Sequence, residues 1–359
     1  MSKTTKIVVG LLIALVAAVG LFSTYKEKDS QNQATIKIGA VVSMSGAASA
    51  TGESLKQGID FAIADLKKDG LNVEVIYQDD KTEPKEVVSA TNNLKLQNVD
   101  GIVGPTWGYL ADTMAPVIDE AKIVTITPAN SSEYVSGKSP YLFFGNIKNS
   151  TSQGVVGEYI KANNVKRIIF VGTQGSWSDT LLDSTKVAAS KNGAEIVYSE
   201  IIPFGSATTS LETIFAKFSE YNPDLIISSI YEDPGTVKLF SKVQQVNPSL
   251  PVVAITESAR KIFENKLVVI QPENNFYIAA PKISKDFRDR YYKEYGKYPS
   301  TYADRAYDSV MIIANGMQEK GEKTLVEYIK SSTYKGEAGQ YKFDTNNDSN
   351  SGVWELQKQ

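Results

Sequence analysis

The chain has 359 residues, of which 42% are hydrophobic and 22% charged, and its formal net charge is −3. This length exceeds what one hydrophobic core usually serves, so we expect two domains. The chain contains no cysteine and no histidine, which excludes cysteine nucleophiles, Ser-His-Asp triads, disulfides and zinc sites built on either residue. It has no basic cluster, so we do not expect nucleic acid as a partner.

The first residues have the pattern of an export signal. Lys3 and Lys6 precede an uninterrupted apolar run, residues 7–22. A charged start followed by an apolar core is typical of a secretory signal peptide, but the run is also close to the roughly 20 residues of a membrane-spanning helix. We therefore predict that residues 1–24 are a cleaved signal peptide or an uncleaved membrane anchor. Residues 25–34 are predicted to be a linker, and the remainder to be extracytoplasmic.

Beyond the linker, hydrophobic periodicity predicts strands and helices in alternation. The predicted strands lie at residues 36–42, 73–77, 102–103, 123–126, 167–172, 195–202, 224–230, 251–255 and 276–280. The predicted helices lie at residues 55–66, 87–96, 110–118, 152–163, 181–189, 211–221, 237–246, 287–295, 302–318 and 325–331. We expect residues 143–152 to be a crossing segment, and residues 341–343 and 353–356 to form a C-terminal hairpin. The alternation predicts the α/β class, with two doubly wound parallel sheets.

Residues 101–135 contain two successive strands that end in small or polar residues and open into helices. Thr106-Trp107-Gly108 forms the first turn, and Asn130 to Glu133 has the pattern of a capping box that opens a second helix. In a parallel sheet these strand ends share one edge, where helix N-termini attract anions such as a carboxylate. We interpret the stretch as one wall of a small-molecule pocket.

Six short motifs carry a resemblance to a known family. They are, in chain order, IKIGAVVSMSG, YQDDKTEP, GIVGP, ITPA, YADRAYDSV and GQYKFDTNND. With them the chain resembles the type I periplasmic solute-binding proteins of ABC importers, specifically the branched-chain amino-acid (leucine/isoleucine/valine) binding family. The resemblance covers nearly everything after the linker.

The resemblance implies the periplasmic binding protein-like I fold, in which two lobes are joined by three crossings and a ligand binds in the cleft between them. Carried onto this chain, lobe one comprises residues 35–147 with 277–333, and lobe two comprises residues 148–276 with 334–359.

The resemblance also implies which residues of lobe one contact the ligand. Gly108, beside Trp107, stands where the family often has serine, so it would offer only a backbone N–H to the ligand carboxylate. Ala129 implies a carbonyl acceptor for the ligand ammonium, and Ser131 a hydroxyl that contacts both ligand groups. Thr51 matches a position that touches the ligand side chain.

In lobe two, the resemblance implies three contact residues. Trp177 matches an aromatic position that is more commonly tyrosine, while Tyr231 and Glu257 match the tyrosine and the acid that hold the ammonium. The residues themselves agree with this assignment, because charges taken out of water must be paired. Gly108 and the helix expected after Ser131 offer donors to a carboxylate, and Glu257 offers the counter-charge for an ammonium.

Each assignment has a plainer interpretation that the sequence leaves open. The plainer interpretations are a solvated loop carboxylate for Glu257, a helix N-cap for Ser131 and an ordinary loop tyrosine for Tyr231. For Trp107 and Trp177 the alternative is a core or surface aromatic, but a cleft-facing position is favoured because both lie in loops of small residues at strand ends.

Two acidic stretches are predicted to be structural rather than metal-binding. Asp79-Asp80 has no further acidic cluster nearby, so we expect a turn. Residues 344–348 begin like a calcium loop but lack its glycine and terminal glutamate, so we expect the turn of a hairpin. No metal and no cofactor is therefore expected.

Taken together, the sequence predicts a monomeric, non-enzymatic, extracytoplasmic protein that binds an amino acid or a related small polar solute. Its partners would be the ABC permease membrane subunits. A membrane-tethered ligand sensor of the same fold is the alternative. A hydrolase or transferase is disfavoured by the lack of histidine and cysteine, and of a Gly-x-Ser-x-Gly elbow or Walker loop.

Overall fold

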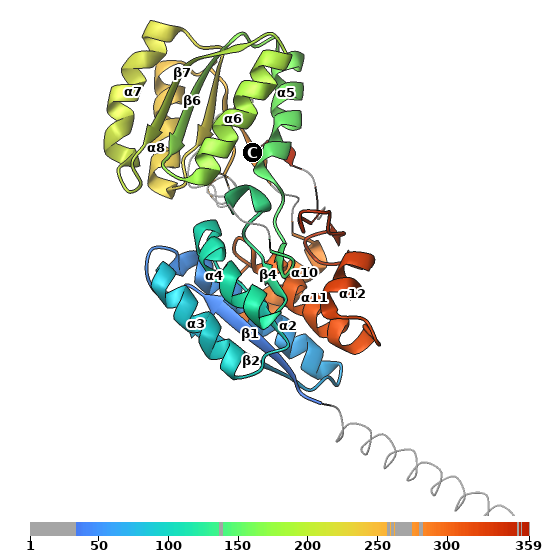
Figure 1. Ribbon diagram of the computed structural model, residues 1–359. Helices are drawn as coiled ribbons and strands as arrows, with labels where there is room; N and C mark the ends of the chain where they lie inside the picture. Colours follow the sequence, from blue (N-terminus) through green and yellow to red (C-terminus); the bar gives the residue numbers. More distant parts are fainter. Residues whose placement is uncertain are drawn as a thin grey trace, which may run out of the picture.

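The computed structural model describes residues 34–135, 139–256, 259, 262, 275–279, 283–349, 352 and 354–358. These residues form two α/β lobes linked by several crossing segments (Figure 1). The predicted signal or anchor segment lies outside the described residues, as does nearly all of the linker. In the part of the chain that the structure describes, no helix combines the length and the apolar character needed to cross a membrane.

Lobe one is built on a five-stranded parallel sheet with the order β2-β1-β3-β4-β5. Its strands are β1 Ile36–Val42, β2 Val73–Asp79, β3 Gly101–Val103, β4 Thr125–Thr127 and β5 Leu142–Phe144. The last three are fully buried, as expected of short apolar runs covered on both faces. The sequence assigned residues 143–152 to a crossing segment, but residues 142–144 complete the sheet. Three apolar residues are too few for periodicity to reveal a strand.

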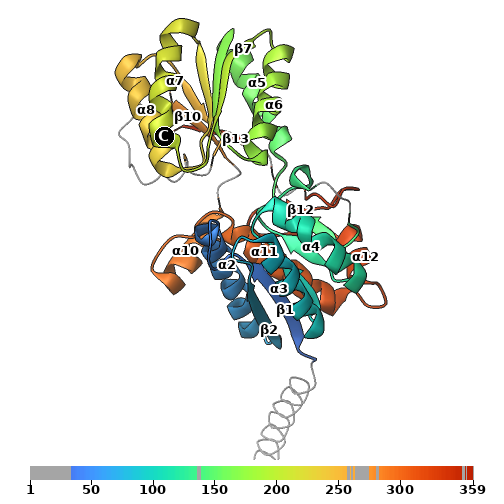
Figure 2. The same cartoon turned by 60° about the vertical axis from the view of Figure 1, so that its left-hand side comes forward.

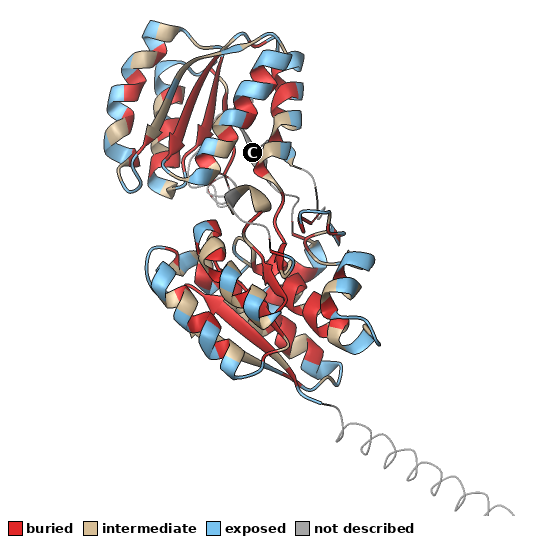
Figure 3. Ribbon diagram, in the orientation of Figure 1, coloured by how far each residue is buried: buried red, intermediate tan, exposed pale blue. Residues whose placement is uncertain are grey.

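Helices cover both faces of this sheet. The core on one face joins strand residues to helices α2 Ser49–Lys68, α10 Lys285–Tyr295, α11 Ala303–Glu319 and α12 Leu325–Ser331. The core on the other face joins them to α3 Pro84–Leu96 and α4 Gly108–Ala121. The buried residues accordingly follow the sheet and the inward faces of the helices (Figure 3).

Lobe two repeats this three-layer plan with a six-stranded sheet of order β13-β10-β9-β8-β6-β7. Its strands are β6 Arg167–Thr173, β7 Glu195–Ile202, β8 Leu225–Ser229, β9 Val252–Ala254, β10 Asn275–Ala279 and β13 Glu355–Lys358. Helices α5 Ser152–Ala162 and α6 Ser176–Lys191 cover one face, and α7 Ala207–Tyr221 and α8 Asp233–Val246 cover the other. The α/β class, predicted from the alternation of strands and helices, is confirmed.

The chain passes between the lobes three times. The first pass runs from β5 to the 3₁₀ turn η2, Asn149–Thr151. The second follows β10, and the third runs from the end of lobe one to β13. Seen from a second direction, the connecting segments lie between the two lobes (Figure 2).

The observed elements move two of the expected lobe boundaries. A boundary at residue 277 would cut β10, which pairs with β9 and β13 of the second sheet, so the second pass begins after Ala279. Residues 334–343 were expected in lobe two. They instead form the small antiparallel pair β11 Tyr334–Lys335 and β12 Gln340–Tyr341, and Tyr341 and Phe343 belong to the core of lobe one.

The predicted C-terminal hairpin is wrong. β13 pairs antiparallel with β10, from Phe276↔Lys358 to Ala279↔Glu355, and not with residues 341–343. It thereby covers what would otherwise be an open strand edge of β10. The sheet of lobe two is parallel except at this last pair.

Candidate functional site between the lobes

The predicted site residues that the structure describes follow the carboxyl ends of strands, either in the connecting loops or in the first turns of the next helices. In lobe one they are Thr51, Trp107, Gly108, Ala129 and Ser131, following β1, β3 and β4; in lobe two they are Trp177 and Tyr231, following β6 and β8. The two sets meet, because the hydroxyl of Tyr231 lies 3.2 Å from Oγ1 of Thr51. This hydrogen bond joins one lobe to the other, so the strand ends that carry the predicted site face each other.

In lobe one, the loop after β3 is held by a buried amide. Asn130 Nδ2 donates to Thr127 Oγ1 at 2.6 Å and to the carbonyls of Pro105 and Thr106 at 3.3 Å each. Thr106 Oγ1 accepts a hydrogen bond from the N–H of Ser43 at 3.0 Å, which ties the same loop to the end of β1. The path of the chain into Gly108 is therefore fixed by side chains of two neighbouring strand ends.

The N-terminus of α4 is suited to an anion. The helix begins at Gly108, its N-cap residue is Trp107, and no side chain caps it. The first N–H groups of a helix have no intrahelical partner, and they lie at the positive end of the helix dipole. The backbone at Gly108 and Tyr109 can therefore bind a carboxylate, as the sequence predicted for this wall.

Ala129 and Ser131 occupy different environments. Ala129 is half-buried, and its carbonyl accepts from Asn146 Nδ2 at 3.2 Å, which leaves one lone pair for a further donor. Ser131 is fully buried and donates its hydroxyl to Glu133 Oε2 at 3.2 Å. The predicted capping box of Asn130 and Glu133 is wrong, because the Asn130 amide bonds to the loop after β3 and only the 3₁₀ turn η1, Ser132–Tyr134, follows. Ser131, the N-cap residue of η1, makes no side-chain cap either.

Lobe two contributes an aromatic cluster. The rings of Trp177 and Tyr231 are 6.3 Å apart, and those of Phe204 and Tyr231 are 6.0 Å apart. Tyr231 is 41% exposed and Phe204 51% exposed. Phe204 was not predicted, although it follows β7 and so lies at the same sheet edge. That position in the strand order was the signal that could have identified it.

A carboxylate holds the loops of this aromatic cluster together. Glu232 Oε2 accepts from Thr173 Oγ1 at 2.6 Å, and its Oε1 accepts from the N–H of Gly205 at 2.7 Å. The N–H of Tyr231 donates to Thr173 Oγ1 at 3.2 Å. The carboxyl ends of β6, β7 and β8 are thus joined, and Tyr231 and Phe204 are fixed relative to each other.

The remaining predicted site residue is Glu257. It lies three positions after the end of β9 and outside the described residues, so its role stays a prediction.

The carboxylates of both acidic stretches accept hydrogen bonds from nearby protein groups. In residues 344–348, Asp344 Oδ1 accepts from the N–H groups of Asn346 and Asp348. Asp79 Oδ1 accepts from the N–H groups of Met44, Ser45 and Lys81, and Asp80 Oδ1 accepts from Ser43 Oγ and the N–H of Thr82. Among the described residues, no group of three potential metal ligands occurs. The prediction that Asp79-Asp80 forms a turn is confirmed by this bonding.

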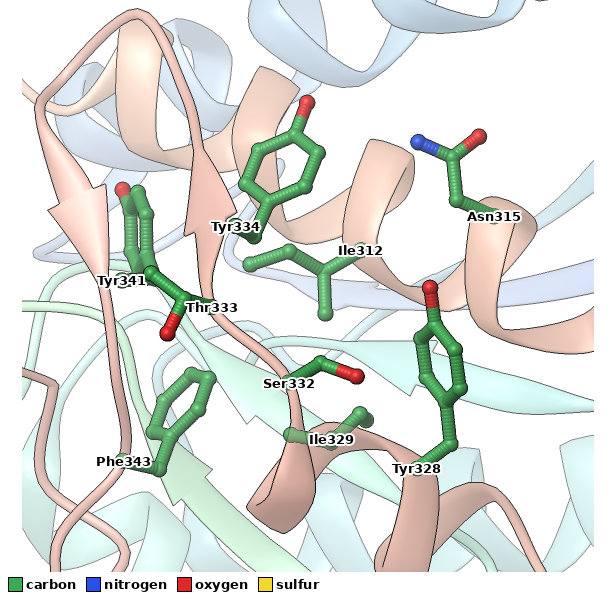
Figure 4. A pocket seen from close by; sticks show the side chains of 9 residues that line it. All are labelled: Ile312, Asn315, Tyr328, Ile329, Ser332, Thr333, Tyr334, Tyr341 and Phe343. Carbon is green, nitrogen blue, oxygen red and sulfur yellow. The ribbon is translucent and has the colours of Figure 1, made fainter. Parts of the chain in front are cut away.

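A separate small cavity lies within lobe one, away from the facing strand ends. It has a volume of about 40 Å³ between α11, α12 and the β11–β12 pair, and its lining includes Asn315, Tyr328, Tyr334 and Phe343 (Figure 4). None of the predicted site residues lines it. The candidate site therefore remains the region between the lobes.

Known proteins share the fold of this chain. A family model described as "Periplasmic binding protein" matches residues 35–356. The chain is 25% identical over 195 residues to the Leu/Ile/Val-binding protein homolog 3 of Brucella melitensis, which covers 51% of the chain and 53% of that relative. It thus spans about half the length of the first curated relatives that it matches.

A longer match is to the leucine-, isoleucine-, valine-, threonine-, and alanine-binding protein of Pseudomonas aeruginosa. The two are 22% identical over 362 residues, which covers 94% of the chain and 92% of the relative. Among solved structures, the substrate binding protein LivJ from Streptococcus pneumoniae, in complex with isoleucine, superimposes with a TM-score of 0.73 at 24% identity. It covers 91% of this chain and 100% of LivJ. These similar proteins are binding proteins rather than enzymes.

Proposed function

The chain belongs to the periplasmic binding protein family, and from this premise we propose that it is the extracytoplasmic substrate-binding protein of an ABC importer. The proposed ligand is an amino acid of the leucine, isoleucine and valine type, bound between the lobes. The observation that carries the proposal is the meeting of Thr51 and Tyr231 across the lobes, on the same edge as the uncapped N-terminus of α4.

The polar ends of the ligand would bind as follows. Its carboxylate accepts hydrogen bonds from the backbone N–H groups of Gly108 and Tyr109. Its ammonium donates to the free lone pair of the Ala129 carbonyl and pairs with Glu257. Both charges leave water when the lobes close, so each needs a partner of its own.

The apolar side chain of the ligand would face the aromatic cluster of lobe two. Trp177, Phe204 and Tyr231 offer ring surface that is partly exposed to solvent, and covering such surface is favourable. Thr51 approaches from lobe one beside Tyr231. Ser131 is fully buried and donates to Glu133, so we assign it to supporting the loop that bears Ala129.

Binding and lobe closure are coupled in this proposal. Contacts to α4 come from lobe one and contacts to the rings come from lobe two, so the ligand makes both sets only when the lobes are together. It therefore shifts the population toward the closed form by the difference in affinity between the two forms. The permease would recognise that closed form.

Titration calorimetry and thermal unfolding of residues 34–359, which include every described strand and helix, test the proposal. We expect L-leucine, L-isoleucine or L-valine to bind without turnover, and to stabilise by about 2.7 kcal/mol at one hundred times the dissociation constant. Urea and benzoate serve as comparison ligands. Glu257→Gln should remove most of the amino-acid affinity. Failure of all three amino acids to bind, or the appearance of a reaction product, would refute the proposal.

We also propose that residues 1–24 direct export of the chain. Cell fractionation followed by N-terminal sequencing of the mature protein tests this. A mature N-terminus within or after this segment indicates a cleaved signal peptide, and an intact N-terminus in the membrane fraction indicates an anchor. Recovery of the intact chain from the cytoplasm would contradict export.

A further inference from the structure

A single carboxylate connects lobe one to the first helix of lobe two. Glu133 belongs to η1, which follows β4 in lobe one. Its Oε2 accepts from the N–H of Asn149 at 2.6 Å and from Ser131 Oγ at 3.2 Å, and its Oε1 accepts from the N–H of Ser150 at 3.0 Å. Three donors therefore converge on one side chain, and two of them belong to the backbone at the start of lobe two.

These two N–H groups begin the continuous helical stretch formed by η2 and α5, residues 149–162. The residues that precede η2 and α5, Lys148 and Thr151, provide no side-chain cap. The first N–H groups of a helix need an acceptor, and a negative charge is favoured at that end of the dipole. Glu133 supplies the acceptor and the negative charge from lobe one, so it caps this helix of lobe two across the connection between the lobes.

The neighbouring contacts tie the first and third passes together at the same place. The N–H of Ser132 donates to Asp348 Oδ1 at 2.8 Å, and Lys148 Nζ lies 2.8 Å from Asp348 Oδ2. Trp354 Nε1 donates to the carbonyl of Lys148 at 2.8 Å. The segment of Ser131, Ser132 and Glu133 is thus linked to two of the three connections between the lobes.

We infer that Glu133 is a positioning residue for lobe closure. It holds the loop that bears Ala129 at a fixed position relative to the first helix of lobe two. The two lobes therefore rotate about the Glu133 contact and do not slide relative to each other. Without the Glu133 contact, the two lobes adopt many relative orientations, and a smaller fraction of these orientations can bind the ligand. The effect on affinity rests on the proposed function, whereas the effect on lobe orientation in the ligand-free protein does not.

Two kinds of variant break this contact. Glu133→Gln replaces one acceptor oxygen by an amide NH₂, which faces backbone donors and cannot accept from them. Asn149→Pro removes the N–H at 2.6 Å and keeps the carboxylate. Proline suits the first helical position, and the preceding Lys148 already has the extended conformation that proline requires, with φ −62° and ψ 131°.

Each variant has a matched control. Asn149→Ala loses the same side chain as Asn149→Pro but retains the N–H. Glu158→Gln makes the same charge change as Glu133→Gln at an exposed position of α5. The comparison of proline with alanine at residue 149 isolates one hydrogen bond, and it remains valid if Glu133→Gln does not fold.

Lobe orientation is measured as a distance distribution. The chain has no cysteine, so Leu96→Cys and Val246→Cys, at exposed helix ends in lobes one and two, provide unique sites for spin labels. We expect Glu133→Gln and Asn149→Pro to broaden the ligand-free distribution in double electron–electron resonance. They should also weaken L-leucine binding about threefold to tenfold. Both controls should match the unsubstituted protein.

The inference is overturned if Glu133→Gln and Asn149→Pro give the same ligand-free distribution as their controls. Failure of the unsubstituted protein to bind L-leucine would instead count against the proposed function. In that case the ligand-free distributions still decide the role of Glu133.

Discussion

The two lobes share one plan but treat polar groups differently. Among the described residues, the buried charged side chains are Asp80, Asp304, Arg305 and Asp308 of lobe one, and Asp348 of a segment that connects the lobes. Lobe two buries serine and threonine hydroxyls, such as Thr173 and Ser229, and presents exposed rings at its strand ends. Buried groups that are hydrogen-bonded on both oxygens, as Asp308 is, specify one geometry, whereas exposed rings adapt to what covers them. This difference supports the proposal that lobe one seats the ligand and lobe two covers it.

The largest predicted effect is on the pH dependence of the free energy of unfolding, and it comes from the buried carboxyl group of Asp308 in lobe one. Asp308 is fully buried, and its two carboxylate oxygens accept from the N–H groups of Glu337 and Ala338 at 2.8 Å. Burial raises the pKa of Asp308 to about 7. The native state therefore holds a proton that the unfolded chain releases near pH 4, so the free energy of unfolding falls as pH rises from 4 to 7. The full span is about 4 kcal/mol.

Urea unfolding between pH 4.5 and 7.5 measures this slope. Asp308→Asn should flatten it, and Asp289→Asn, at an exposed position of α10, should leave it intact. Asp80, whose pKa burial also raises, should contribute to the slope that remains in Asp308→Asn. If the pH dependence of the free energy of unfolding is unchanged in Asp308→Asn, the buried carboxyl group of lobe one does not set that dependence.

The second prediction concerns the buried amide that fixes the loop before Gly108. Asn130→Ala leaves the carbonyls of Pro105 and Thr106 without their side-chain donor. We expect the free energy of unfolding to fall by about 2–3 kcal/mol, and L-leucine affinity to fall about tenfold or more, because the anion-binding loop loses its support. Urea unfolding and calorimetry measure the two effects. Asn92→Ala on the exposed face of α3 is the control, and equal effects from both would contradict the role of Asn130.

A smaller effect, on affinity alone, is expected in lobe two. Phe204→Ala removes a ring that is half exposed, so the free energy of unfolding should change by less than about 0.5 kcal/mol. L-leucine affinity should fall by about 1 kcal/mol, while L-alanine affinity should hardly change, because only the longer side chain reaches the ring. Competition calorimetry measures the ratio. Tyr298→Ala, an exposed ring of lobe one, is the control, and a uniform loss for both ligands would remove Phe204 from the site.

The α/β architecture could be predicted because buried positions recur along the sequence with the period of a strand or a helix. Alternating runs predicted the two parallel sheets, and parallel sheets place strand ends at one edge, which brings Thr51 and Tyr231 to the site. The pairing of β13 with β10 was not predictable in this way, since periodicity reports which face is buried and not which strand is the neighbour.

The hydrogen-bond partners in and near the site could not be predicted from the sequence either. Glu133 was assigned to a capping box within its own loop, but its carboxylate accepts from N–H groups 16 and 17 residues further along, in the other lobe. A capping pattern identifies a carboxylate that accepts from a helix start without identifying which helix. Phe204 was missed because it follows an edge strand with no motif around it.

The smallest predicted effect comes from the direct hydrogen bond between the two lobes. The hydrogen bond between Thr51 and Tyr231 is exposed, so its net contribution to closure should be about 0.5–1 kcal/mol. Thr51→Val and Tyr231→Phe each remove it. In a double-mutant cycle on L-leucine affinity, the double variant should lose no more than the larger single loss, because the same contact is broken only once. Strictly additive losses would mean that the two hydroxyls contact the ligand separately, and that the lobes meet only through what they bind.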